Sequence, residues 1–206
     1  MNATDELVQL DPALKVEPYL GGEYHSFRQT DCAFVSFPSG IDVEEGEFLY
    51  GLVRICKPEF VLETGTNMGI SARYIALALK RNGRGRLRTI EHDTTVHRAA
   101  SNKIAQSGFS DIVECVCGKV EDQTLPDRID FAWLDTEPLI RYGELVRIFP
   151  HMAVRGIIAV HDLVWPDETN VFGSVPEVMR ELLDTGQLTV VTFKTYRNVT
   201  LFQRTR

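Results

Sequence analysis

Four acidic residues and one histidine stand at the carboxyl ends of apolar runs of strand length: Glu63, Glu91, Asp135, His161 and Asp162. Carboxylates gathered in one place attract cationic ligands, accept hydrogen bonds from hydroxyl groups and bind hard divalent cations. A histidine titrates near neutral pH and can accept a proton. If the runs are neighbouring parallel strands, these side chains meet at one edge of a sheet, where open α/β sheets bind their ligands.

The segment LETGTNMGIS, residues 62–71, places one of these acids beside a glycine-bearing turn. Gly65 and Gly69 allow close approach of a ligand to the backbone, and Asn67 tolerates a left-handed conformation. The segment lacks the full G-x-G-x-x-G pattern and is not a P-loop. A pyrophosphate here would meet the Glu63 carboxylate, which is an unfavourable contact between like charges. S-adenosylmethionine has no phosphate and carries an ammonium and a sulfonium, so it suits this turn.

Glu91, 28 residues after Glu63, ends the next apolar run. An acid at this place can accept hydrogen bonds from the two hydroxyls of a ribose. The alternative is that both glutamates are solvated charges at strand ends.

Apolar runs alternate with helical stretches along most of the chain. Several of the runs are almost continuously apolar, as in strands that are covered on both faces of a parallel sheet. The expected parallel strands are 59–64, 86–91, 112–117, 129–134 and 156–161. Two further runs, 188–193 and 198–202, are too close together for a crossover helix and predict an antiparallel hairpin. The sequence predicts an α/β fold, a Rossmann-like doubly wound sheet of seven strands.

Capping signals set the helix boundaries. Asn82-Gly83 ends the helix after the glycine turn, and Asp93 is a candidate N-cap for the next helix, which runs to about Gly108. Ser174-x-x-Glu177 reads as a capping box. We divide the chain into residues 1–42, an N-terminal extension or lid, and residues 43–206, the domain that binds the cofactor.

Composition favours a small-molecule partner. The 22 basic and 29 acidic residues give a net charge of −7, which disfavours nucleic acid and anionic membranes. The amino-terminal sequence has no signal-peptide pattern and no apolar run is long enough to span a membrane, so we expect a cytoplasmic protein. The four cysteines are predicted to be small buried thiols. A homo-oligomer remains open.

The stretches EGEFLYGLVRICKPEFVLETGTNMGIS and RYGELVRIFPHMAVRGIIAVHD carry a family resemblance. From about Glu45 to Asp162 the sequence resembles the class I S-adenosylmethionine-dependent methyltransferases, especially the O-methyltransferases related to catechol and caffeoyl-CoA O-methyltransferases. The resemblance implies contacts to the methionine part, the ribose and the adenine of the cofactor. The residues concerned are Glu63, Gly65, Thr66, Asn67, Gly69, Ser71, Glu91, His92, Gly118, Lys119, Val120, Glu121 and Asp135.

The same resemblance raises the question of a metal. In metal-dependent relatives, two aspartates at the places of Asp135 and Asp162 and an asparagine after the second hold Mg²⁺. Here Leu163 stands at the third place, and Pro138 replaces a catalytic lysine. Asp135 and Asp162 could still bind Mg²⁺ or another divalent cation with waters completing the shell.

Without a metal, His161 is the predicted general base, and Asp135 or Asp162 could orient it or bind the substrate. The alternative is a strand-end histidine that is satisfied by a backbone carbonyl. Trp165, Asn170 and Phe172 are candidates for the acceptor pocket.

The expected function is transfer of a methyl group from S-adenosylmethionine to a small-molecule hydroxyl. A nicotinamide-dependent oxidoreductase and a cofactor-binding domain without catalytic activity are the alternatives.

Overall fold

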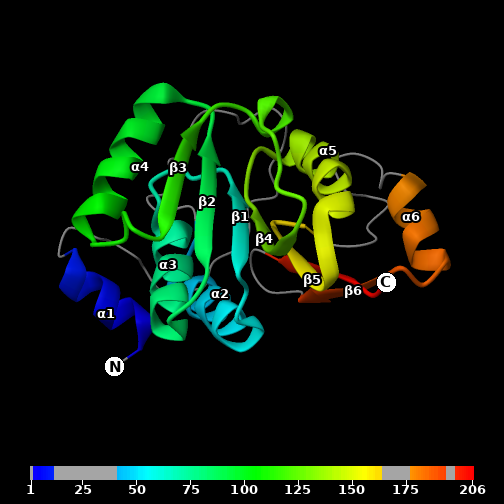
Figure 1. Cartoon of the computed structure of the whole chain (residues 1–206), viewed down its shortest axis with the longest axis horizontal. Coiled ribbons are helices and arrows are strands. Elements are labelled where there is room, and N and C mark those ends of the chain that lie inside the picture. Colours follow the sequence, from blue (N-terminus) through cyan, green and yellow to red (C-terminus); the bar gives the residue numbers. More distant parts are fainter. Residues whose placement is uncertain (1, 12–40, 164–176, 194–197) are drawn as a thin grey trace, which may run out of the picture.

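A single seven-stranded sheet forms the centre of the computed structural model, which describes residues 2–11, 41–163, 177–193 and 198–206. Its strands are β1 (Phe60–Thr64), β2 (Arg86–Glu91), β3 (Val113–Cys117), β4 (Ile129–Leu134), β5 (Met152–His161), β6 (Leu188–Phe193) and β7 (Val199–Arg204). Their order is β3-β2-β1-β4-β5-β7-β6, and its first five strands can be followed from left to right in Figure 1. The first five are parallel, whereas β7 is antiparallel to both β5 and β6. The predicted fold class is confirmed.

Strand β5 begins at Met152, earlier than the sequence predicted. The pairing of β4 with β5 shifts register between Ile129 and Phe131, so the strand contains an irregularity before Gly156. Arg155 has a positive φ of 70° there. The glycine therefore lies within an irregular strand and does not mark its start.

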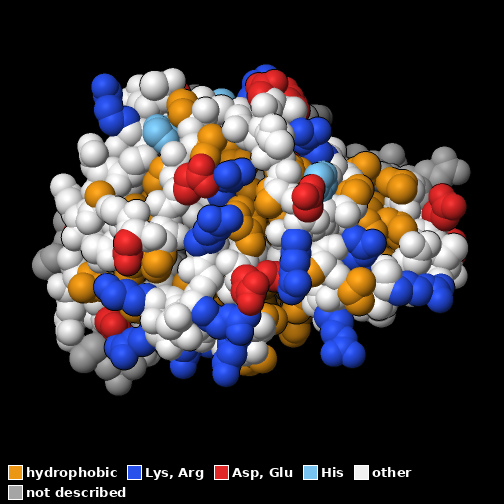
Figure 2. Space-filling model, in the orientation of Figure 1, with side chains coloured by type: hydrophobic (Ala, Val, Ile, Leu, Met, Phe, Trp, Pro, Cys, Tyr) orange, Lys and Arg blue, Asp and Glu red, His pale blue; other side chains and the backbone are white. Residues whose placement is uncertain are grey.

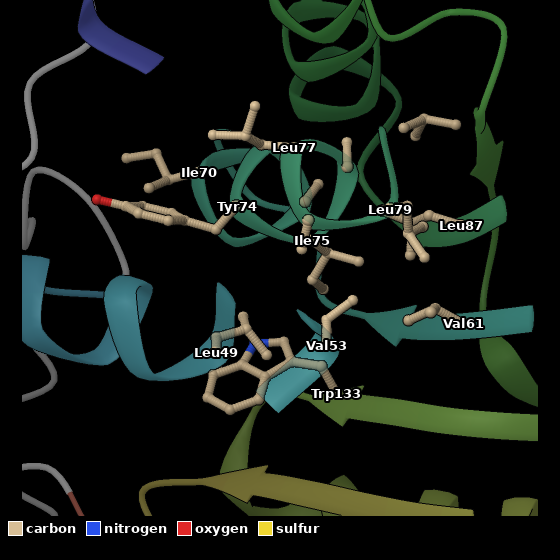
Figure 3. Packing of buried hydrophobic residues seen from close by; sticks show 14 of the residues in the cluster. Leu49, Val53, Val61, Ile70, Tyr74, Ile75, Leu77, Leu79, Leu87 and Trp133 are labelled. Atoms are coloured by element: carbon tan, nitrogen blue, oxygen red, sulfur yellow. The ribbon is translucent and has the colours of Figure 1, made fainter. Parts of the chain in front are cut away.

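Helices cover both faces of the sheet. They are α1 (Ala3–Leu10), α2 (Val43–Cys56), α3 (Ile70–Asn82), α4 (Thr94–Gln106), α5 (Pro138–Ile148) and α6 (Glu177–Asp184), with short 3-10 helices at Val120–Asp122 and Phe149–His151. On one face, α1, α2 and α3 share a buried cluster with strand residues; in Figure 3, Trp133 of β4 lies against Leu49 and Val53 of α2. On the other face, Leu145 of α5 and Met179 of α6 belong to a second buried cluster.

The predicted helix caps are confirmed where the structure describes them. Gly83 follows α3 with a φ of 66°, and the Asp93 side chain accepts hydrogen bonds from the first backbone N–H groups of α4. That helix ends at Gln106, just before Gly108, which has a φ of 75°. Ser174 lies outside the described residues.

The amino-terminal helix packs on the domain. The Thr4 hydroxyl donates to Glu47 of α2 at 2.6 Å and lies 2.6 Å from the Tyr74 hydroxyl of α3. Arg73 of α3 forms a buried ion pair with Asp11 at 2.5 Å. Residues 12–40 lie outside the described part of the chain, so the division at residue 42 stays a prediction.

The cysteine prediction is wrong for two positions. Cys56, at the end of α2, and Cys117, at the end of β3, are exposed, and Cys115 is only half-buried. The physical reason for Cys115 and Cys117 is that β3 is the edge strand of the sheet, so it is covered less than the central strands. Cys32 lies outside the described residues.

Charges of both signs are interspersed on the molecular face in Figure 2. At the amino ends of the strands, two exposed arginines pair with acids, Arg84 with Glu59 at 2.7 Å and Arg128 with Asp130 at 2.8 Å. No helix in the described part of the chain is long and apolar enough to cross a membrane.

Candidate active site

The glycine turn lies where the strand order reverses, because β1 pairs with β2 on one side and with β4 on the other. Gly65, Asn67 and Gly69 all have positive φ values, of 83°, 46° and 72°, as the sequence predicted for this turn. A Cβ atom at Gly65 would stand 2.3 Å from the backbone oxygen of Asp135. The turn after β1 thus touches the end of β4, and only glycine fits at this contact.

Glu63 lies beneath this turn with no exposed surface. Its Oε2 accepts a hydrogen bond of 2.5 Å from the Thr89 hydroxyl, and Oε1 has no partner among the described residues. Burial raises the pKa of Glu63 to about 7, although hydrogen bonds from Ser71 and Thr89 act to lower it. The Thr66 hydroxyl in turn lies 2.5 Å from that of Thr89.

These contacts change the expected role of three residues. Glu63, Thr66 and Ser71 are all buried, at 0%, 3% and 5% exposure, so they support the turn from below. A ligand that binds above the turn would feel the Glu63 charge through space, without a direct contact unless the turn moves.

Glu91 joins the turn to the next helix. Its Oε2 accepts a hydrogen bond of 2.9 Å from the backbone N–H of Asn67, and its Oε1 accepts one of 3.0 Å from Asp93. Each carboxylate oxygen can accept a second hydrogen bond, so capacity for a ribose hydroxyl remains. The side chain of Glu91 is only 7% exposed, which holds it in this orientation.

A cavity of about 540 Å³ opens beside the turn. It is lined by six residues that the sequence singled out: Gly65, His92, Gly118, Lys119, Val120 and Glu121. Its opposite wall comes from α5 and includes Glu144, whose Oε2 accepts hydrogen bonds from the hydroxyls of Thr64 and Thr136 at 2.9 and 2.7 Å. Burial raises the pKa of Glu144.

His161, at the end of β5, is surrounded by carboxylates and fully buried. Its Nδ1 lies 2.8 Å from Asp135 and 3.3 Å from Asp162, and its Nε2 lies 3.0 Å from Glu45 of α2. The ring also packs on Trp133, with 5.5 Å between the ring centroids.

Protonation of His161 follows from this arrangement. Burial alone would lower its pKa, but the charges of Asp135 and Asp162 and hydrogen bonds to Asp135 and Glu45 outweigh burial and raise the pKa to about 10. Both ring nitrogens then donate, so no lone pair is available to accept a proton at neutral pH. The general-base hypothesis for His161 stays a prediction, and both ring nitrogens face carboxylates rather than the backbone carbonyl of the alternative.

Arg141 of α5 is a second cation in the same cluster and is 7% exposed. Its Nη2 lies 3.2 Å from Asp135 Oδ1 and 3.7 Å from Asp162 Oδ2. Its Nη1 donates to the backbone oxygen of His161, and its Nε donates to that of Thr136 at 2.6 Å.

Comparisons with known proteins fit this geometry. Residues 62–163 match a family described as a methyltransferase domain. A catechol O-methyltransferase of Niastella koreensis is 33% identical over 90 residues, which are 44% of this chain and 39% of that protein. An Arabidopsis thaliana protein named "Putative caffeoyl-CoA O-methyltransferase" is 30% identical over 151 residues, which are 68% of this chain and 62% of that protein. These matches span less than two thirds of either relative's own length.

Solved structures share the fold. An O-methyltransferase of Streptomyces achromogenes, solved with S-adenosylmethionine, has a TM-score of 0.69 at 22% identity, covering 81% of this chain and 82% of that one. An O-methyltransferase of Bacillus cereus, solved with S-adenosylhomocysteine, has a TM-score of 0.68 at 19% identity, covering 80% and 82%. Residues 62–163 are therefore similar to a methyltransferase domain, and the chain shares the fold of these solved structures. The predicted resemblance to catechol and caffeoyl-CoA O-methyltransferases is confirmed, and the oxidoreductase alternative is not favoured.

Three buried residues of the site were missed by the sequence analysis: Glu45, Arg141 and Glu144. The signal for Glu45 was present, because Asp42-x-x-Glu45 is a capping box at the start of α2. Arg141 and Glu144 stand three residues apart on α5, and so on one helix face, but a charged helix residue ordinarily reads as solvated.

Some predicted site residues stay predictions. Trp165, Asn170 and Phe172, the predicted acceptor pocket, lie outside the described residues. Pro138 is the first residue of α5.

Proposed function

We propose that this chain binds S-adenosylmethionine and transfers its methyl group to an oxygen atom of a small molecule. The observation that carries the proposal is the pair of acids at the glycine turn, Glu63 beneath it and Glu91 bonded to its backbone. In its ionised form Glu63 adds to the charge of Glu91, and the two carboxylates then disfavour a pyrophosphate and favour a cationic ligand. The oxygen preference comes from the names of the related O-methyltransferases.

The residues of the turn and cavity fit the three parts of the cofactor. Gly65 lines the cavity and Asn67 is exposed, so the backbone of the turn is accessible to the methionine part. The carboxylate of Glu91 would accept from the ribose hydroxyls, while His92 and Val120 in the cavity wall would flank the adenine. When bound, S-adenosylmethionine supplies an electrophilic methyl group on a sulfonium.

Asp135 is the residue that we place beside the acceptor. Its Oδ1 is held by His161 and Arg141, and none of these contacts uses its other oxygen. The side chain is 15% exposed, more than any other member of the cluster. We assign it the task of accepting a hydrogen bond from the acceptor hydroxyl and aligning that oxygen with the methyl group. Alignment of two reactants at close approach supplies a large part of the rate in such reactions.

His161 and Arg141 hold the Asp135 carboxylate and do not themselves meet the acceptor in this assignment. His161 donates to Asp135 from Nδ1 and to Glu45 from Nε2. A carboxylate fixed from two sides loses little further freedom when the acceptor binds.

Calorimetry with S-adenosylmethionine, S-adenosylhomocysteine and NAD tests the cofactor. We expect both adenosyl compounds to bind and NAD to give no heat. Binding of NAD alone would remove the methyltransferase proposal and restore the oxidoreductase.

A cofactor-binding domain without catalytic activity is tested by turnover. Production of S-adenosylhomocysteine is measured with catechol and 3,4-dihydroxycinnamate as acceptors, for the wild type and Asp135→Asn. We expect turnover to fall at least about a hundredfold in Asp135→Asn, with cofactor affinity nearly unchanged. Equal turnover in both proteins would remove Asp135 from the reaction.

Two further expectations remain proposals. These are a cytoplasmic location and a homo-oligomer, of which light scattering measures the second.

A further inference from the structure

The cluster at the ends of β4 and β5 contains a set of groups that by distance could hold a metal. One ligand atom each from Asp135, His161 and Asp162 lies within 4.8 Å of the others. These are also the places at which the sequence resembles metal-dependent relatives. Whether an ion fits depends on what else contacts those atoms.

The donor atoms are already engaged by cations. Asp135 Oδ1 receives both His161 Nδ1, at 2.8 Å, and Arg141 Nη2, at 3.2 Å. Asp162 Oδ2 has the same two neighbours, at 3.3 and 3.7 Å. A divalent ion on these oxygens would stand close to the guanidinium, in a site from which water is largely excluded.

The imidazole is not available as a ligand either. A metal binds a ring nitrogen through its lone pair, but Nδ1 already lies 2.8 Å from Asp135 Oδ1 and Nε2 lies 3.0 Å from Glu45 Oε1, so neither nitrogen is open to an ion. Leu163 adds no ligand atom at the third place and is 4% exposed. The residues present therefore do not fit Mg²⁺, because a guanidinium already lies on the carboxylates and both imidazole nitrogens are already engaged.

We propose that Arg141 is a built-in cation that holds Asp135 and Asp162 in the place of a divalent ion, so that methyl transfer by this chain needs no metal. The catalytic part of this inference rests on the proposed function, whereas its metal-binding part does not. Arg141 acts as a positioning residue, since it reaches the acceptor only through Asp135.

The guanidinium is fixed well enough for this role. Nε donates to the backbone of Thr136, just after β4, and Nη1 donates to the backbone of His161, at the end of β5. Arg141 itself comes from the first turns of α5. One side chain thus ties two strand ends to the helix between them, and rotation away from the carboxylates would break both backbone hydrogen bonds.

Metal binding is measured first, with Mn²⁺ as the probe and the protein stripped by a chelator. Loss of the free-ion signal in electron paramagnetic resonance reports binding. We expect the wild type to bind no stoichiometric Mn²⁺. Arg141→Ala should gain one site, with an affinity at least about tenfold higher than any residual binding by the wild type. That site should disappear in the double variant Arg141→Ala, Asp162→Asn. The matched control is Arg128→Ala, which removes an exposed arginine from Asp130 at the other end of the sheet.

Two outcomes would overturn the inference. One is a wild-type Mn²⁺ site that is lost in Asp135→Asn, because the carboxylates then hold a metal despite the arginine. The other is a folded Arg141→Ala that gains no site, because the arginine is then not what closes the cluster. If Arg141→Ala fails to fold, Arg141→Gln takes its place. The wild-type titration still tests whether the carboxylates hold Mn²⁺.

Turnover supplies the second readout. We expect chelation to leave wild-type methyl transfer unchanged, and Arg141→Ala to lose kcat with little change in cofactor affinity. Mn²⁺ should restore part of that kcat in Arg141→Ala and do nothing in Arg128→Ala, a rescue that a merely structural role would not give. Inactivation of the wild type by chelation would refute metal independence. Absence of any turnover would count against the proposed function alone, since the Mn²⁺ titration stands apart from it.

Discussion

Replacement of Glu63 by glutamine tests the electrostatics beneath the glycine turn. The substitution keeps the size of the side chain and removes its charge. The hydroxyls of Ser71 and Thr89 can rotate to suit an amide, so the local hydrogen bonds need not be lost. Burial is the main cause of the raised pKa, so the charge of Glu63 is a cost to the folded state.

The size of that cost follows from the pKa. The pKa rises from an ordinary value near 4.5 to about 7, and each unit corresponds to about 1.4 kcal/mol, so ionised Glu63 costs roughly 3 kcal/mol. The folded state holds this proton more tightly than the unfolded chain does. The stability that Glu63 contributes is therefore fully present below about pH 4.5 and is lost as the pH rises through about 7.

Urea denaturation of the wild type and Glu63→Gln at about pH 5 and about pH 8 measures this effect. The free energy of unfolding of Glu63→Gln relative to the wild type should increase by about 2.5 kcal/mol between these pH values. Most of the increase should occur below about pH 7. A difference between the two proteins that does not change with pH would refute the reasoning, because Glu63 would then titrate alike in the folded and unfolded states.

Two other substitutions test the geometry around the turn and the cluster. Gly65→Ala should lose more than about 2 kcal/mol of stability, because its Cβ would meet backbone at a positive φ. The control Gly51→Ala lies inside α2 with nothing within 4 Å of the new Cβ, so it should gain roughly 0.5 to 1 kcal/mol. Equal urea midpoints for the two variants would contradict this prediction. His161→Gln should lose roughly 3 to 5 kcal/mol, because it removes one of the two cations that face Asp135 and Asp162 and the one that faces buried Glu45. A melting temperature within a few degrees of the wild type would show that the imidazolium is not needed there.

The sequence predicted the fold well because its signals are local. Apolar runs set the strands, and Asn82-Gly83 and Asp93 set helix ends through backbone geometry and capping that depend on few neighbours. The start of β5 was misplaced because the register shift depends on pairing with β4, which no local pattern reveals.

The site was harder to predict because burial of charged residues next to one another changes their protonation and their partners. His161 read as a base from its ordinary pKa, but three carboxylates from separate parts of the chain surround it and keep it protonated. Arg141 was not singled out from the sequence, where it is one of many charged helix residues. Its role appears only when the ends of β4 and β5 come together, which is a property of the tertiary fold.

The two buried cations also bear on the balance of charge in the proposed reaction. A sulfonium loses its positive charge as the methyl group leaves, so an excess of nearby carboxylates would stabilise the reactant more than the transition state. Three carboxylates and two cations, His161 and Arg141, form this cluster. The net charge of the cluster is therefore −1, whereas the carboxylates alone would give −3. Glu63 adds little when it is protonated. The site can thus attract a cationic cofactor without holding it so strongly in the ground state that methyl transfer is slowed.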